Sequence, residues 1–165
     1  MSQRDFHLAQ INIARTRFDI DDPRFQTFID LLAPVNAVAE RMPGFVWRLT
    51  DETGDGAVGV PGFDDPRIII NMSVWTDEEA LFAFAYKTAH TKVMSRRAEW
   101  FEPLARTHLA LWWIPAGHIP DVAEGRARLE RIDRDGPTPS AFGFADLHDP
   151  HGAPIGPGLP QAERV

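Results

Sequence analysis

Short segments of alternating apolar and polar residues are separated along this chain by segments in which apolar residues recur every three or four positions. Alternation predicts half-buried strands, and the longer period predicts amphipathic helices. The strand pattern occupies residues 7–15, 45–50, 67–75 and 107–115. The helical pattern occupies residues 22–41, 77–101 and 121–135. The predicted order is therefore strand–helix–strand–strand–helix–strand, followed by a terminal helix.

Signals at the helix ends support this order. Asp22-Pro23 begins the first helix, with the aspartate as N-cap and the proline at the first helical position. Pro34 lies inside the apolar stripe of that helix, so we expect a kink or a break there. Thr76 and Glu79 have the spacing of a capping box for the second helix, and Asp121 is the expected cap of the third.

The order of elements predicts an α+β fold of the ferredoxin-like, split βαβ type. Such a fold has a four-stranded antiparallel sheet with both crossover helices on one face; here it has an extra C-terminal helix. We expect one domain over residues 1–135 and an extended or disordered tail over residues 136–165, which are rich in Pro and Gly. No crossover helix covers the other sheet face, so a homodimer, as in a dimeric α/β barrel, is the natural way to bury it.

Composition narrows the classes of function. The chain has no cysteine, which excludes disulfides and thiolate chemistry. Its net charge of −7 argues against binding to nucleic acid or to an anionic membrane surface. No apolar run is long enough to span a membrane, and no apolar signal-peptide core follows Met1, so we expect a cytoplasmic protein.

Strand parity divides the sheet side chains between two faces. The face expected to meet the helices takes Ala9, Ile11, Ile13, Ile68, Ile70, Met72, Val74, Leu109, Leu111 and Trp113. The opposite face takes Gln10, Asn12, Asn71, Ser73, Trp75, His108, Ala110 and Trp112, joined by either Arg48 or the pair Trp47 and Leu49. Apolar and aromatic walls with a few polar groups are typical of a small-molecule pocket. The alternative is that these amides satisfy one another within a dimer interface.

Two polar side chains lie within the apolar stripe of the helix predicted for residues 77–101. They are His90 and Arg97. Tyr86, His90 and Met94 are spaced so that their side chains can meet. Because histidine titrates close to neutral pH, His90 is a candidate general base; the alternative is a core histidine bonded to a backbone carbonyl. Arg97 alternatively extends to solvent or pairs with an acid.

Several motifs resemble a known superfamily. Met42-Pro43-Gly44-Phe45, Ser73-Val74-Trp75-Thr76-x-x-Glu79-Ala80-Leu81 and a histidine in the next helix resemble the dimeric α/β-barrel superfamily. That group includes antibiotic-biosynthesis monooxygenases and haem-degrading monooxygenases. More narrowly, the chain resembles an uncharacterised bacterial domain family of that superfamily over about residues 6–135. The motifs that carry this narrower resemblance are Asn71-Met72-Ser73-Val74-Trp75, Arg96-Arg97-x-Glu99-Trp100-Phe101 and Leu111-Trp112-Trp113-Ile114-Pro115-Ala116-Gly117-His118.

The resemblance implies a homodimer in which two sheets pair into a barrel, each subunit holding a cavity between its sheet and its helices. Haem-degrading members use an asparagine, a tryptophan and a histidine at positions that match Asn12, Trp75 and His90. By that resemblance His90 would ligate haem iron, and it is a candidate metal ligand only if haem is bound. Related barrels also carry out oxygenation without a cofactor, so haem is possible rather than required.

We therefore predict a pocket for a small apolar, aromatic or polyketide-like molecule, with possible monooxygenase-like or haem-associated oxidoreductase activity. The candidate catalytic residues are His90, Asn12 and Trp75. The candidate substrate-binding residues are Asn71, Ser73, Tyr86, Arg97, His108, Trp112 and Arg48. Two alternatives stay open: a binding or sensing dimer without turnover, and a tryptophan-rich face that serves dimerisation alone.

Overall fold

The computed structural model describes residues 3–51, 62–88 and 90–155. The strands are β1 (Phe6–Thr16), β2 (Phe45–Arg48), β3 (Ile68–Trp75), β4 (Phe101–Glu102) and β5 (Leu109–Pro115). The helices are α1 (Gln26–Arg41), α2 (Glu78–Lys87), α3 (His90–Ser95) and α4 (Val122–Asp135), and the 3₁₀ turns are η1 (Gln3–Asp5), η2 (Pro23–Phe25) and η3 (Arg97–Glu99). Among these described helices, none is long and apolar enough to cross a membrane.

The sheet has the strand order of a ferredoxin-like fold. β1 lies in the centre and pairs antiparallel with β3 on one side and with β5 on the other. β2 pairs with the outer side of β3, and the short β4 pairs with the end of β1. The order β5–β1–β3–β2, with every pair antiparallel, confirms the predicted split βαβ topology.

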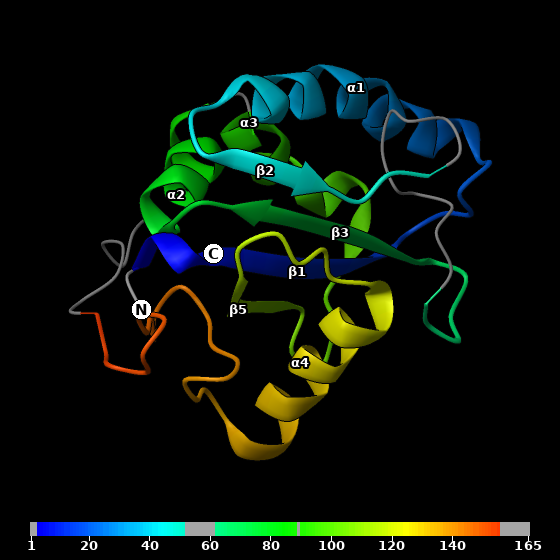
Figure 1. Ribbon diagram of the computed structural model, residues 1–165. Helices are drawn as coiled ribbons and strands as arrows, with labels where there is room; N and C mark the ends of the chain where they lie inside the picture. Colours follow the sequence, from blue (N-terminus) through cyan, green and yellow to red (C-terminus); the bar gives the residue numbers. More distant parts are fainter. Residues whose placement is uncertain (1–2, 52–61, 89, 156–165) are drawn as a thin grey trace.

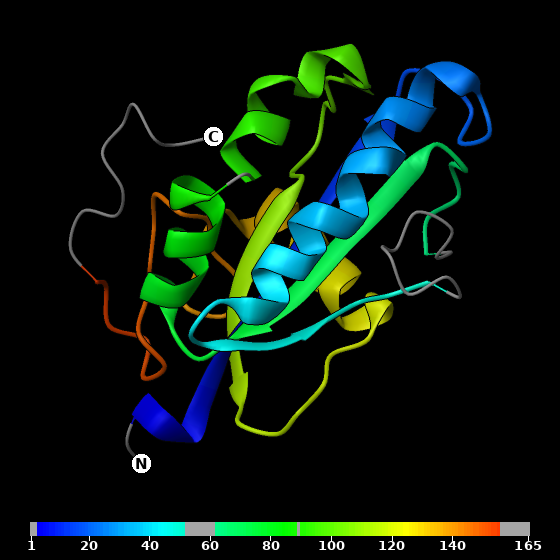
Figure 2. The same ribbon diagram turned by 90° about the horizontal axis from the view of Figure 1, so that it is seen from above.

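Helices cover both faces of this sheet. α1, α2 and α3 lie on one side and α4 lies on the other (Figures 1 and 2). Leu129 of α4 is fully buried in the cluster that contains Ile11 and Met72. Gly125 allows α4 to approach closely, because a Cβ there would lie 2.7 Å from Ile11 Cδ1. The expectation of a bare second face is therefore wrong, and the predicted homodimer stays a prediction without that support.

The assignment of the two faces to the helices is reversed. The aliphatic set of β1 and β3, including Ile11, Ile70 and Met72, packs against α4. The opposite set, including Leu8 and Trp75, packs with α1 and α2. The physical reason is that a continuous aliphatic face needs complete cover, which the terminal helix provides. The side chains with amides therefore face α1, α2 and α3.

The face assignment of β5 is wrong by one residue. In the β1–β5 pair Gln10 lies opposite Leu111, and Ala9 lies opposite Trp112. Directly opposed residues of an antiparallel pair share a face. The face with the amides therefore receives Leu109, Leu111 and Trp113, and the aliphatic face receives Ala110, Trp112 and Ile114. The sequence of β5 is almost continuously apolar, so it contains no alternation that could determine the parity.

The helix predicted for residues 77–101 is broken after Lys87. Thr88 has extended backbone angles (φ −127°, ψ −176°). Its hydroxyl donates a hydrogen bond to the Phe84 carbonyl at 2.6 Å, and the Thr91 hydroxyl donates to the Thr88 carbonyl at 2.8 Å. Such short side chains compete with the backbone bonds of a helix. α2, α3 and η3 therefore replace one long helix.

The other helix ends agree in part with prediction. Asp121 caps α4 as expected, since its carboxylate accepts from the Glu124 N–H at 2.8 Å. The cap of α2 is Asp77 rather than Thr76, because the Asp77 carboxylate accepts from the Ala80 N–H at 2.8 Å. Pro34 does not break α1. It is exposed, so the carbonyl that loses its partner there can be hydrated.

The segment after α4 runs along the edge of β5 and packs on the domain. Phe142 exchanges two backbone hydrogen bonds with Leu111, at 2.7 and 3.0 Å. Phe142 and Leu147 are buried, and the Trp113 indole N–H donates to the His148 carbonyl at 2.7 Å. The described part of the predicted tail, residues 136–155, therefore protects an edge strand.

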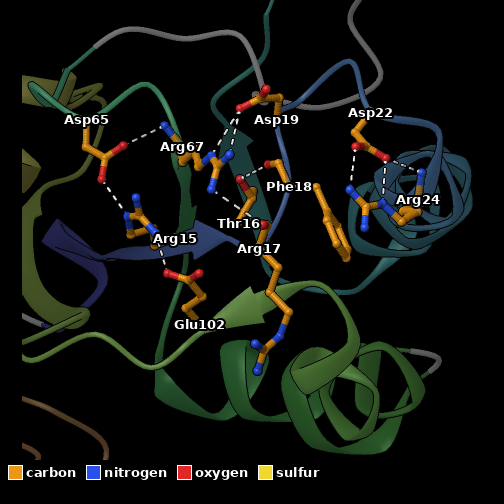
Figure 3. Close-up of polar contacts among 10 residues, drawn as sticks. All are labelled: Arg15, Thr16, Arg17, Phe18, Asp19, Asp22, Arg24, Asp65, Arg67 and Glu102. Carbon is orange, nitrogen blue, oxygen red and sulfur yellow. Dashed lines mark hydrogen bonds and ion pairs between the residues drawn. The ribbon is translucent and has the colours of Figure 1, made fainter.

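Ion pairs hold the end of β1 to its neighbours (Figure 3). Arg15 bridges Asp65, at 2.7 Å, and Glu102 of β4. Arg67 reaches Asp19 at 3.0 Å. These pairs are partly exposed to solvent, so they orient the loops and contribute little to stability.

We predict that Gly44→Ala lowers the free energy of unfolding by about 3 kcal/mol, because it adds backbone strain and overlap. Gly44 has φ +87°, and a Cβ there would lie 2.5 Å from Ala80 Cβ and 2.7 Å from Thr76 Oγ1. Urea unfolding followed by circular dichroism measures the change. Gly117→Ala is the control, since Gly117 has φ +95° with open space around it. This control variant should lose only about 1 kcal/mol of unfolding free energy, from backbone strain alone. Equal losses of stability in the two variants would contradict the predicted overlap at Gly44.

Candidate functional site

Four polar side chains form a hydrogen-bonded network on the sheet face that α1, α2 and α3 cover. We call Gln10, Asn12, Asn71 and Ser73 the amide patch. Gln10 Nε2 donates to Asn71 Oδ1 at 2.7 Å and to Ser73 Oγ at 2.8 Å. Asn12 Nδ2 donates to Gln10 Oε1 at 3.1 Å and to Asn71 Oδ1 at 3.2 Å. The β1–β3 register explains the network, because it sets Gln10 opposite Ser73 and Asn12 opposite Asn71.

Trp75 closes one end of the amide patch. Its side chain is 1% exposed, and its indole N–H donates to Ser73 Oγ at 2.8 Å. Phe45 and Phe84 pack on it, with ring centroids at 5.5 and 5.3 Å. A ring buried in this way has no free surface for stacking on a ligand. Trp75 therefore supports Ser73 from within the core.

The other end of the amide patch is open. Gln10 is buried, Asn12 is half-buried and Asn71 is exposed to solvent. Among the residues that the structure describes, none bonds to Asn71 Nδ2 or to Asn12 Oδ1. The patch therefore offers one donor and one acceptor at the end that solvent reaches.

A cation lies beside the patch. Arg48 is opposite Ser73 in the β2–β3 pair, whereas Trp47 is opposite Val74 on the aliphatic face. Of the two arrangements left open by the sequence, the structure therefore has Arg48 on the face with the amides. Its side chain is 12% exposed, and its Nε donates to Glu40 Oε1 at 2.7 Å.

Sequence reasoning missed a buried amide on α1. Asn36 is 9% exposed and lies on the buried face of α1 together with Phe28 and Ala39. Helical spacing from these two apolar residues is the signal that could have found it. A buried polar side chain on the helix that covers the amide patch is a further candidate for positioning.

Several predicted binding residues lie elsewhere. Trp112 is buried on the α4 side, where its indole N–H donates to Glu124 Oε2 at 2.8 Å. Arg97 is exposed on η3, and His108 is exposed in the loop before β5. Tyr86 packs beside the C-terminal segment, with its ring centroid 5.8 Å from that of Phe144. None of these four hydrogen-bonds to the amide patch in the described structure.

His90 begins α3, and its side chain lies outside the described part of the structure. Its predicted roles as general base and as haem ligand stay predictions. The spacing argument that joined His90 to Tyr86 is wrong, because it needs a helix that is unbroken at Thr88. His90 and Met94 both lie in α3, so their predicted spacing of four helical residues is retained.

The residues around the amide patch do not fit haem. Asn12 and Trp75 share the face that the helices cover, as the resemblance to haem-degrading enzymes implies. Trp75, however, would have to leave the core to lie against a porphyrin. Within the described ranges, which leave out the His90 side chain, no group of three His, Asp or Glu side chains is arranged to hold a metal ion directly.

Comparison with curated proteins found no match. The fold is similar to a conserved protein from Methanosarcina mazei Go1, with a TM-score of 0.48 and 11% identity over 68% of this chain and 95% of that chain. It is similar to a putative antibiotic biosynthesis monooxygenase from Nitrosomonas europaea, with a TM-score of 0.45 and 15% identity over 73% of this chain and 99% of that chain. It is also similar to SnoaB, a cofactor-independent oxygenase from Streptomyces nogalater, with a TM-score of 0.41 and 16% identity over 70% of this chain and 98% of that chain. Such distant likenesses carry no function to this chain.

Sequence comparison is more decisive than these structural likenesses. One family model matches residues 7–155, which is most of the chain and includes the segment packed along β5. The resemblance to an uncharacterised domain family is thereby confirmed. The chain belongs to the family described as "Domain of unknown function (DUF3291)".

Proposed function

We propose that the protein binds a small organic molecule at the open end of the amide patch, through neighbouring oxygen atoms of that molecule. The observation that carries this proposal is the pair formed by Asn71 Nδ2 and Asn12 Oδ1. In the described structure, this donor and this acceptor are without partners at the end of a network whose other bonds are made. A ligand with a carbonyl and a hydroxyl group matches the two atoms.

The network holds these two atoms in place before a ligand arrives. Asn12 and Asn71 are opposed on neighbouring strands, and both bond to Gln10, which is 5% exposed. Side chains that are already ordered lose little rotational freedom on binding, which favours affinity.

The surroundings favour a ligand with an apolar body. Leu109 lies opposite Asn12 on the same face. Ile69 lies two residues before Asn71 on the same face and packs with the aromatic cluster around Phe28 and Trp100. A mainly apolar wall with a few polar groups suits an aromatic or polyketide-like molecule with a phenolic hydroxyl and a carbonyl.

A second candidate is cofactor-free, monooxygenase-like oxidation of the same ligand. The observation that favours it is Arg48, whose largely buried side chain comes from the β2 position opposite Ser73 and pairs with Glu40. A cation there would stabilise a phenolate or enolate oxygen, and such an electron-rich anion is the form that reacts with O₂. The amides and the hydroxyl of the patch cannot accept the phenolic proton at neutral pH. The candidate base is therefore His90.

Calorimetric titration with 1,8-dihydroxyanthraquinone tests the binding proposal. We expect saturable binding at one site per chain, weakened about three- to tenfold by Asn71→Ala, the effect of one neutral hydrogen bond. Because Asn71 is exposed, the free energy of unfolding should change by less than about 0.5 kcal/mol. Gln26→Ala removes an exposed amide on α1 and is the matched control. Absence of binding, or equal affinity in both variants, would refute the proposal.

Oxygen uptake with 1,8-dihydroxyanthrone tests the second candidate. Each anthrone oxidised should consume one O₂ and give one anthraquinone and one water. We expect turnover above the uncatalysed rate and its loss in His90→Ala, with binding of the anthraquinone retained. Binding without turnover in the wild-type protein would leave a binding or sensing protein.

A third measurement separates structural bonds of the patch from binding ones. We expect Ser73→Ala to lower the free energy of unfolding by about 1–3 kcal/mol, since it leaves the buried Trp75 indole N–H without an acceptor. Ser95→Ala on α3 is the control, because Ser95 is exposed and its hydroxyl bonds only to the Lys92 carbonyl. Urea unfolding measures both, and equal small losses would contradict a structural role for Ser73.

A further inference from the structure

A cavity of about 670 Å³ lies where three parts of the chain meet. Its lining comes from residues 104–109 of the β4–β5 connection and β5, from Asp133 in α4, and from residues 143–146 of the C-terminal segment. Cavities of about 300–1,000 Å³ are the usual size for small ligands. None of the four residues of the amide patch lines this cavity.

Arg106 lines this cavity with its hydrogen-bonding groups unused. Within the described ranges, its guanidinium donates no hydrogen bond and makes no ion pair, and its Nε is buried without a partner. The guanidinium lies over the ring of Phe63, with Cζ 5.4 Å from the centroid. Arginine presents its donors in a rigid planar fork. Because the Nε is enclosed, an acceptor from outside the described chain would have to bind the two terminal nitrogens, which have no hydrogen-bond partner in the described structure.

The acids of the cavity do not supply that acceptor. Asp133 Oδ1 accepts from the Thr107 N–H at 2.8 Å. Hydrogen bonds from Thr107, together with the charge of Arg106, hold the pKa of Asp133 below its ordinary value, so this carboxylate is ionised. Asp146 is exposed at the cavity. Two acids beside one guanidinium make the charged groups of the lining net negative, which disfavours a doubly charged anion such as phosphate more strongly than a singly charged carboxylate.

The remaining wall is apolar and includes an aromatic ring. Leu104 and Leu109 line the cavity, and each packs against a buried cluster of the domain. Phe144 lines it from the C-terminal segment, held by the Phe82 ring at 5.1 Å and the Tyr86 ring at 5.8 Å between centroids. These side chains suit a flat apolar body rather than a sugar or a peptide.

We propose that this cavity binds a small aromatic monocarboxylate, with the carboxylate on the Arg106 guanidinium and the ring against Leu109 and Phe144. An arginine and a carboxylate form two parallel charge-assisted hydrogen bonds, which here would come from the two terminal nitrogens of Arg106. Leu109 borders both this cavity and the amide patch, but none of the four patch residues lines the cavity, and this proposal does not rest on the function proposed for the patch.

Isothermal titration with 2-naphthoate tests this site. We expect saturable binding at one site per chain, with 2-naphthamide bound at least tenfold more weakly. Arg106→Gln should weaken 2-naphthoate at least tenfold. Arg126→Gln is the matched control, since Arg126 also lies over Phe63, at 5.1 Å, but bonds to Glu130 and to the Gly62 carbonyl. It should leave the affinity unchanged.

Phe144→Ala provides a second, independent variant and should weaken the binding of 2-naphthoate and of 2-naphthamide by the same factor. Circular dichroism checks that each variant is folded. If Arg106→Gln is not folded, Arg106→Lys replaces it and should weaken the binding of 2-naphthoate at least threefold. Absence of binding, equal affinity for acid and amide, or tighter binding of 2-naphthylmethylamine would overturn the proposal. Asn71→Ala should leave 2-naphthoate binding intact, so failure at one site is distinguishable from failure at the other.

Discussion

The register of β1 against its two neighbours is the constraint on which the rest of this structure depends. β1 pairs with β3 over residues 8–15 and with β5 over residues 6–12, so residues 8–12 have a fixed opposite on either side. Gln10 thereby lies between Ser73 and Leu111, and Ile11 lies between Met72 and Ala110. A shift of one residue would exchange every amide for an aliphatic side chain. The hydrogen-bonded patch and the aliphatic core are consequences of one alignment.

The two faces of the sheet are closed in different ways. The aliphatic face is sealed by α4, with Leu129 fully buried and Gly125 close to Ile11. The other face is covered by apolar clusters around Trp75 and around Trp100, and Asn71, between them along β3, remains exposed. Complete burial on one side supplies stability, which allows a polar and partly open surface on the other. Binding sites on rigid strands hold their groups in place well.

The C-terminal segment links several of these features. Its backbone pairs with Leu111 at the edge of β5, and its Phe144 ring reaches the aromatic side chains of α2. The same segment forms one wall of the cavity that contains Arg106. A stretch without regular secondary structure therefore protects an edge strand and shapes a candidate binding site, as loops held on a rigid scaffold commonly do.

The sequence by itself determined the elements and their order, because alternation, helical spacing and caps such as Asp121 are local signals. It also grouped Gln10, Asn12, Asn71 and Ser73 on one face, since parity within a strand is a local property. Tertiary structure alone decided which helices cover that face, because α4 competes with the crossover helices for the aliphatic side. It also decided the parity of β5, whose nearly uniform apolar sequence carries no alternation, and the break at Thr88, where side-chain hydroxyls compete with the helix backbone. The unused donors of Arg106 are likewise a tertiary outcome, since no local pattern shows which partners a side chain will lack.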